Sequence, residues 1–346
     1  MKTLASQAIG LTFFTALLLQ QNAFAGELKP SQLETADKAQ SDASLSPART
    51  GDAPKFALTL AGGWARGAAH VGVLKVLERE GLRPDFVCGN SIGAMIGGLY
   101  AAGVPVSEIE RIVLSGEFGK AFFPHNRHLR VFTYGLKYGM ARSVLIHPQI
   151  GLYSGKSLAN FVERNLPEGV TDIENMPIQF AASAVDLLTT KTVWLTKGNI
   201  SEAVRASNSV PGFFRPVKVG EHVLVDGGLR ANLPTEIAEA KGAPMVVAVR
   251  LQAYLEPVPQ KEYDTILDYG DRLTSILLAE AETRGASKAD VIIQPKLPWM
   301  RITTYRKKEL EMAIKEGEAA AEKMLPQLHA LKKQRDSLAG GALVNQ

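Results

Sequence analysis

The sequence has 346 residues, of which 46% are hydrophobic, so it is long and apolar enough to bury one large core. The formal net charge of +4 suits contact with an anionic surface. It falls far short of the basic composition typical of nucleic-acid-binding proteins, and we expect no nucleic-acid partner. The single cysteine, Cys88, excludes an internal disulfide and, within an apolar run, is expected to be buried and inert.

Residues 1–25 are typical of a secretory signal, with one basic residue, an apolar run over 9–19 and small residues at Ala23 and Ala25. We expect cleavage after Ala25 and export to the periplasm or the medium, which N-terminal sequencing of the mature protein would check. A single membrane anchor is the alternative, disfavoured by the short apolar run. Residues 26–53 are rich in small and polar side chains, which predicts a flexible leader.

From residue 56 onward, short apolar runs alternate with amphipathic stretches, which predicts an α/β fold on a mostly parallel sheet. The predicted strands are 56–61, 85–89, 178–184, 192–196, 222–225, 245–250 and 290–294. The predicted helices are 68–80, 92–102, 155–165, 200–207, 234–241, 264–285 and 307–333. With no clean linker after residue 54, we expect one domain over 54–335 and a disordered tail over 336–346.

A candidate nucleophile lies in the run Gly89-Asn90-Ser91-Ile92-Gly93, which follows an apolar strand and leads into a helix. At such an elbow the flanking glycines let strand and helix pass closely, and the serine hydroxyl is presented at the helix N-terminus, where negative charge is favoured. The alternative is an ordinary strand-to-helix turn with a serine cap.

The sequence offers no well-placed histidine to act as the base for this serine. An elbow serine usually takes a carboxylate and then a histidine further along the chain, but only His329 lies late enough, in a charged helix. Asp226 instead ends an apolar strand and precedes Gly227 and Gly228. Because groups at the carboxyl ends of strands converge in α/β sheets, we expect Asp226 to lie beside Ser91. A simple turn-forming role for Asp226 is the alternative.

A glycine-rich turn over 61–67 precedes the first predicted helix. Its spacing fails the dinucleotide-binding pattern at Trp64, and it lacks the lysine of a phosphate-binding loop. A turn of free N–H groups beside the serine's strand suits an oxyanion hole, where fixed donors stabilise the charge that forms in the transition state.

Taken in order, a glycine-rich loop ending Arg66-Gly67, a G-x-S-x-G elbow and a distal Asp-Gly-Gly resemble the patatin-like phospholipases. Further similarity lies in Arg205-Ala206-Ser207 with Pro211, in Asn232-Leu233-Pro234 and, to bacterial members of the family, in residues 289–293 and the helix after them, to about residue 335. The resemblance implies a three-layer α/β/α fold, a Ser–Asp dyad, and no metal or other cofactor. Its residue assignments make Ser91 the nucleophile, Asp226 the base, the backbone of Gly62, Gly63 and Trp64 the oxyanion donors, and Arg66 with Gly67 the residues that order the loop.

The implied activity is a serine esterase acting on phospholipids or other acyl esters, of the phospholipase A or lysophospholipase type. Two alternatives stay open. Trp64 stands where the family commonly has glycine, and if that position requires φ > 0 the tryptophan is strained; a lipid-binding pseudoenzyme is then conceivable. The same dyad would also serve an acyltransferase or thioesterase.

Residues 118–160 contain no Asp or Glu and interleave basic with aromatic side chains. This pattern predicts a cap that contacts an anionic membrane. The alternative is a segment that packs its aromatic rings on the core and leaves its charges in water.

Overall fold

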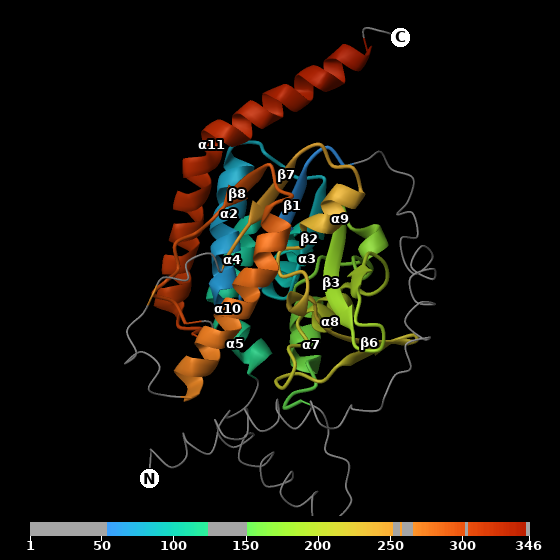
Figure 1. Ribbon diagram of the computed structural model, residues 1–346, viewed down its shortest axis with the longest axis vertical. Coiled ribbons are helices and arrows are strands. Elements are labelled where there is room, and N and C mark those ends of the chain that lie inside the picture. The colour runs from blue at the N-terminus through green and yellow to red at the C-terminus, as the bar shows by residue number, and fades with distance from the viewer. Residues whose placement is uncertain (1–53, 124–150, 252–256, 258–265, 302–303, 344–346) are drawn as a thin grey trace, which may run out of the picture.

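The computed structural model describes residues 54–123, 151–251, 257, 266–301 and 304–343 (Figure 1). The predicted signal and leader lie outside the described residues, as does 124–150, the greater part of the predicted membrane-contacting segment. Cleavage, export and the role of that segment therefore stay predictions.

A sheet of eight strands, in the order β5-β6-β3-β2-β1-β7-β8 with β4 also paired to β3, forms the centre of the described chain. Its parallel strands are β1 (Ala57–Leu60), β2 (Phe86–Gly89), β3 (Gln179–Asp186), β7 (Val246–Val249) and β8 (Val291–Ile293). The antiparallel additions are β4 (Thr192–Leu195), β5 (Val217–Val219) and β6 (His222–Asp226). The mostly parallel sheet predicted from the sequence is confirmed.

Successive strand residues face opposite sides of the sheet, and the two sides carry separate apolar clusters. Leu58 of β1 belongs to the large cluster built with helices on one side, whereas its neighbour Ala57 belongs to a smaller cluster with Ile237 on the other. The helices of the larger cluster include α2 (Ala68–Arg79), α3 (Ile92–Ala101), α4 (Val106–Leu114), α5 (Gly116–Phe122), α7 (Lys156–Arg164) and α8 (Ile200–Ser207). The opposite side is covered by α9 (Thr235–Ala240), against which α10 (Ile266–Ala286) packs. The three-layer α/β/α fold is confirmed.

The last helix, α11 (Lys307–Leu343), lies beside α2 and then projects past the body of the molecule to the C-terminus (Figure 1). The two helices touch backbone to backbone: a Cβ on Gly72 would lie 1.9 Å from the carbonyl oxygen of Ile314, and one on Gly317 would lie 2.0 Å from that of Ala69. Only glycine permits so close a crossing.

The end of the final helix and two short helices differ from the sequence prediction. The final helix ends at Leu343 rather than near 333, so 336–343 of the predicted disordered tail is helical. The Leu and Ala residues there favour helix, and each residue added to an existing helix gains one hydrogen bond, so a glycine pair alone does not end it. The short helices α4 and α5 were not predicted, although α4 repeats apolar side chains at 106, 109, 112 and 113. Within the described chain, no helix combines the length and the apolar character that crossing a bilayer requires.

Candidate active site

Ser91 forms the turn between β2 and α3. Its backbone, with φ 52 and ψ −120, lies in a region that costs a non-glycine residue free energy. The flanking glycines explain how the turn closes: a Cβ on Gly89 would lie 2.4 Å from the backbone of Gly93, and one on Gly93 would lie 2.2 Å from the carbonyl oxygen of Leu60. The predicted elbow is therefore present, with Ser91 directly preceding the N-terminus of α3.

The elbow is fastened to the end of α8. The N–H of Ser91 donates to Ser207 Oγ at 2.9 Å, and Asn208 Nδ2 donates to the Ser91 carbonyl at 2.9 Å. Asn208 Nδ2 also donates to the carbonyl of Val204, so its Oδ1 is turned to accept the Ser91 hydroxyl at 3.2 Å. These buried contacts hold the strained turn and orient the serine side chain. Sequence reasoning missed Asn208, although it directly follows a stretch that resembles the family.

Asp226 ends β6 opposite Ala184 of β3, and both it and Ser91 are buried, at 6% and 7% exposure. Its Oδ1 accepts the N–H of Gly228 at 2.7 Å and Nδ2 of Asn90 at 3.1 Å. Burial raises the pKa of Asp226 to about 6, although hydrogen bonds from Gly228, Ser91 and Asn90 each lower it. The structure thus places Asp226 close enough to Ser91 for the serine to lower its pKa, while the Ser91 hydroxyl donates to Asn208 Oδ1.

The glycine loop lies directly against the elbow, since a Cβ on Gly62 would be 3.2 Å from Cβ of Ser91. The N–H of Gly62 donates to the carbonyl of Asn232 at 3.1 Å and is therefore already engaged. Among the described residues, the N–H groups of Gly63 and Trp64 have no backbone acceptor, and Trp64 begins the short helix η3 (Trp64–Gly67), whose first N–H groups have no partner within the helix. Of the three predicted oxyanion donors, Gly62 therefore has its N–H engaged by Asn232, and the role of the amides of Gly63 and Trp64 stays a prediction.

The backbone of Trp64 has a positive φ of 51, so the condition under which a tryptophan at this position is strained is met. Strain of this kind costs on the order of 1–3 kcal/mol. Its indole is 6% exposed, stacks on Phe123 at 6.0 Å between ring centroids, and meets Phe213 edge-on at 5.1 Å. Removing a buried tryptophan side chain costs about 3–5 kcal/mol, so packing outweighs the strain.

We therefore expect Trp64→Gly to lower the free energy of unfolding by about 2 kcal/mol, the difference between lost packing and relieved strain. Urea denaturation followed by circular dichroism measures it. Trp299→Gly, which removes an indole that is 39% exposed, is the matched control and should cost less. A Trp64→Gly variant as stable as the wild type would show that strain dominates.

Two side chains brace the loop. Arg66 Nε donates to the carbonyl of Met300 at 2.8 Å, and Arg66 Nη1 reaches Ser275 Oγ of α10 at 3.5 Å. His70 is fully buried with Nε2 2.8 Å from the carbonyl oxygen of Ala61, and burial lowers the pKa of His70 to about 4, so the neutral ring donates there. Gly67 packs on Ile92 too closely for a side chain, which joins the loop to the start of α3.

No hydrogen bond joins any described histidine to Ser91 or Asp226. Nδ1 of His222 lies 3.1 Å from Asp186, and Nε2 of His329 lies 3.3 Å from Glu80. His70 bonds to the glycine loop, so each of the three described histidines has its partner away from Ser91. Among the described residues, Asp226 is therefore the candidate base beside Ser91. His125, His128 and His147 lie outside it.

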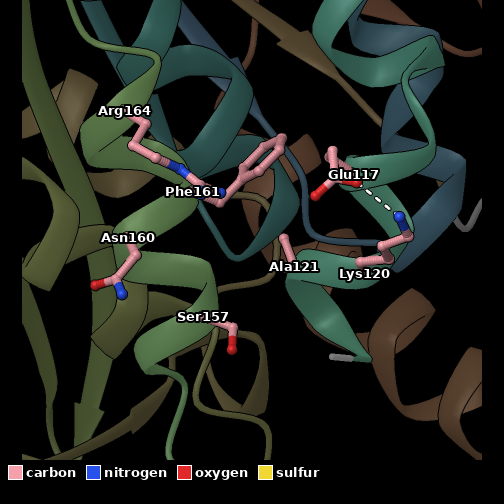
Figure 2. Close-up of a pocket in the computed structure, with 7 residues that line it drawn as sticks. All are labelled: Glu117, Lys120, Ala121, Ser157, Asn160, Phe161 and Arg164. Carbon is pink, nitrogen blue, oxygen red and sulfur yellow. Dashed lines mark hydrogen bonds and ion pairs between the residues drawn. The ribbon is translucent and has the colours of Figure 1, made fainter. Parts of the chain in front are cut away.

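A hollow of about 260 Å³ lies between α5 and α7 and contains none of the predicted site residues (Figure 2). Its lining includes Lys120, which forms an ion pair with Glu117 at 2.7 Å. Phe118, Phe122 and Tyr153, predicted to face a membrane, are instead 0%, 2% and 3% exposed. For these three rings the membrane prediction is wrong, because packing against Phe161, Phe214 and Tyr305 removes their apolar surface from water.

Comparison with known proteins places these features in a family. Residues 58–239 match the family model of the patatin-like phospholipases. The chain is 31% identical over 208 residues to an uncharacterized NTE family protein of Mycobacterium tuberculosis. This alignment covers 59% of this chain and 51% of the relative. It is 32% identical over 209 residues to Lysophospholipase NTE1 of Mycosarcoma maydis, covering 60% of this chain and 10% of that protein. Among solved structures, VipD from Legionella pneumophila aligns with a TM-score of 0.44 at 14% identity, covering 80% of this chain and 67% of VipD. Because the family match spans more than half of the sequence, this chain belongs to the patatin-like phospholipase family.

Proposed function

We propose that this protein hydrolyses carboxylic-ester bonds of phospholipids or lysophospholipids, with Ser91 as nucleophile and Asp226 as base. The observation that carries the proposal is the burial of Ser91, on a strained elbow, beside a carboxylate whose pKa is raised to about 6. An aspartate in water is a weak base for serine, and burial moves its pKa toward the range useful at neutral pH. Family membership and the fungal relative named as a lysophospholipase support the substrate class.

In the first step Asp226 accepts the hydroxyl proton while Ser91 Oγ bonds to the ester carbonyl carbon. The carbonyl oxygen becomes an oxyanion, which the N–H groups of Gly63 and Trp64 and the N-terminus of α3 stabilise. The C–O bond to the alcohol then breaks, and the alcohol leaves with the proton from Asp226. In the second step water attacks the acyl-serine and gives its proton to Asp226, which returns it to Ser91 as the fatty acid departs.

This mechanism predicts how the rate depends on pH. Because the base must be ionised, kcat/KM should rise tenfold per pH unit below a midpoint of about 6 and level off above it. Hydrolysis of p-nitrophenyl butyrate between about pH 3 and 9 measures the profile, with protein stability recorded at each pH. A midpoint near pH 4 would mean that the essential carboxyl is not the buried Asp226.

The substrate class is tested with purified protein on a panel of phospholipids, lysophospholipids and short p-nitrophenyl esters, using Ser91→Ala as the control. Release of fatty acid by the wild type alone supports the proposal. Labelling of Ser91 by a fluorophosphonate separates an enzyme from a lipid-binding pseudoenzyme. Product analysis with alcohol acceptors and with thioesters separates hydrolysis from acyl transfer or thioester cleavage.

Peripheral contact with an anionic membrane remains part of the proposal on the basis of Arg127, Arg130, Lys137 and Arg142, all outside the described residues. Each basic side chain near an anionic bilayer adds about 1 kcal/mol to binding. Changing all four to Gln should therefore weaken sedimentation with anionic vesicles by at least tenfold, and salt should weaken wild-type binding. Equal binding by both proteins would contradict the proposal without affecting Ser91 or Asp226.

A further inference from the structure

A line of buried polar side chains runs from Asp226 to α10. Asn90 Nδ2 donates both to Asp226 Oδ1 and to Asn232 Oδ1, each at 3.1 Å. Asn232 Nδ2 donates to Glu282 Oε1 at 3.0 Å, and Glu282 Oε2 accepts from Arg250 Nε at 3.1 Å. Asn90, Asn232 and Glu282 are fully buried, so water does not compete for these bonds.

Asn232 also holds the glycine loop. Its Nδ2 donates to the carbonyl of Gly62 at 3.2 Å, and its own carbonyl accepts the N–H of Gly62 at 3.1 Å. Both polar backbone groups of Gly62 are therefore bonded to one residue. The loop that carries the amides of Gly63 and Trp64 and the elbow that carries Ser91 thus share Asn232 as a common support.

The hydrogen bonds in this line have a fixed direction because an ionised carboxylate can only accept. Glu282 and the carbonyl of Gly62 both require the nitrogen of the Asn232 amide, which turns the Asn232 oxygen toward Asn90. Asn90 must then offer its own nitrogen, and its oxygen accepts the hydroxyl of Ser183 at 2.8 Å. Asp226 consequently meets an N–H donor instead of a carbonyl oxygen.

Arg250 supplies the positive charge that a buried carboxylate needs to remain ionised. It directly follows β7, and its Nη2 also donates to Thr283 Oγ1 of α10 at 3.1 Å. A glutamine at 282 would fill the same space and still form hydrogen bonds. It would leave the Gly62 carbonyl, at the longer distance of 3.2 Å, to fix the direction of the Asn232 amide, because a glutamine amide can present either oxygen or nitrogen to Asn232.

We infer that Glu282 and Asn232 are positioning residues, which fix the amide of Asn90 with its nitrogen toward Asp226 and hold Gly62 of the glycine loop in place. The inference rests on the proposed function for its catalytic meaning. The arrangement itself is a property of the folded chain and can be tested without turnover.

Other charged groups on the elements around Asp226 have partners elsewhere. Asp186 of β3 pairs with His222 of β6, and Arg284 of α10 donates to the carbonyl of Arg230. The groups that set the pKa of Asp226 besides its burial are the uncharged donors Gly228, Ser91 and Asn90. A change at Glu282 therefore reaches Asp226 through the orientation of the Asn90 amide.

The test compares the unfolding free energy of wild type and Asp226→Asn between pH 3 and 8, in the native background and with Glu282→Gln. The folded pKa of Asp226, about 6, exceeds its ordinary value of 3.8. The wild type therefore loses stability relative to Asp226→Asn as the pH rises between these two pKa values, which define the titration window. The upper end of the window reports the folded pKa. We expect Glu282→Gln to move it up by about one unit, because a turned Asn90 amide no longer donates to the carboxylate.

Glu239→Gln, which changes a glutamate with a 59% exposed side chain, is the matched control and should leave the window unchanged. An unchanged window in Glu282→Gln overturns the inference. If Glu282→Gln does not unfold cooperatively, Arg250→Gln takes its place. This change removes the cation paired with Glu282, which favours a protonated Glu282 that can donate to Asn232. An unchanged titration window in Arg250→Gln would also overturn the inference.

A second readout uses turnover of a short ester. Glu282→Gln is expected to lower kcat about tenfold at pH 6 with little change in KM, and to recover part of the loss at pH 8. Full activity at pH 6 contradicts the inference. A wild type with no ester turnover would overturn the proposed function alone, since the unfolding measurements would still decide whether Glu282 orients the Asn90 amide.

Discussion

We expect kcat on a short ester to fall by roughly 10³-fold or more in Ser91→Ala, in Asp226→Asn and in the double variant. The three losses should be about equal. The effects do not add because the serine attacks only when its proton has an acceptor, and the acceptor is useless without the nucleophile. Steady-state kinetics on p-nitrophenyl butyrate, with fluorophosphonate labelling to count active sites, measures the three losses.

Both substitutions should leave the fold intact. An asparagine at 226 still offers an oxygen to Gly228 and Asn90, and an alanine at 91 removes only the hydroxyl that donates to Asn208. Circular dichroism and thermal melting provide the control. A folded variant that retains most of its turnover would show that the Ser–Asp assignment is wrong.

Gly62→Ala is expected to lower kcat/KM by on the order of 10²-fold, the effect of displacing an oxyanion donor. The added Cβ would lie 2.5 Å from Asn232 Oδ1 and 2.6 Å from Asn90 Nδ2, so the loop must move away from the elbow. Such a shift carries the N–H groups of Gly63 and Trp64 away from the position of the oxyanion. Kinetics on the same short ester measures it.

Gly116→Ala is the matched control, because this glycine begins α5 and a Cβ there would meet nothing within 4 Å. It should keep full activity. If Gly62→Ala does so as well while remaining folded, the glycine loop does not supply the oxyanion donors, and the proposed mechanism loses that component.

The sequence was sufficient to predict the parts of the site that depend on local chain geometry. The elbow at Ser91 could be predicted because glycines two positions away on each side, a preceding strand and a following helix are all visible in one short run. Asp226 could be identified because it ends an apolar strand. The reason for their proximity differs from the one expected: β3 lies between β2 and β6, and β6 runs antiparallel to β3, so Asp226 reaches the carboxyl edge of the parallel strands by ending opposite Ala184.

The supporting side chains could not be predicted in the same way, because their contacts join distant segments. Asn90 and Asn232 are 142 positions apart, and Asn232 and Glu282 are 50 apart. Asparagine and glutamate are common surface residues, and only tertiary packing decides that these three are buried. The engagement of the Gly62 N–H by Asn232 was hidden for the same reason, and it changes which amides can serve as donors.

The aromatic residues at 118, 122 and 153 illustrate a different limit. A run with rings between basic side chains fits a membrane surface and an apolar core equally well, since both environments remove the rings from water. The choice depends on neighbours such as Phe161 and Tyr305, which come from elsewhere in the chain. Composition of the segment alone does not contain that information.

The backbone contact between α2 and α11 bears on the order in which the chain folds. Gly72 touches Ile314, so a contact that supports the helix after the glycine loop joins residues more than two hundred positions apart. Contacts of such long sequence separation form slowly, because closing the loop between them costs entropy before any packing is gained. A chain still emerging from the ribosome cannot cover α2 until its last segment has been made. We therefore expect chains truncated before Lys307 to leave this apolar surface uncovered and to aggregate.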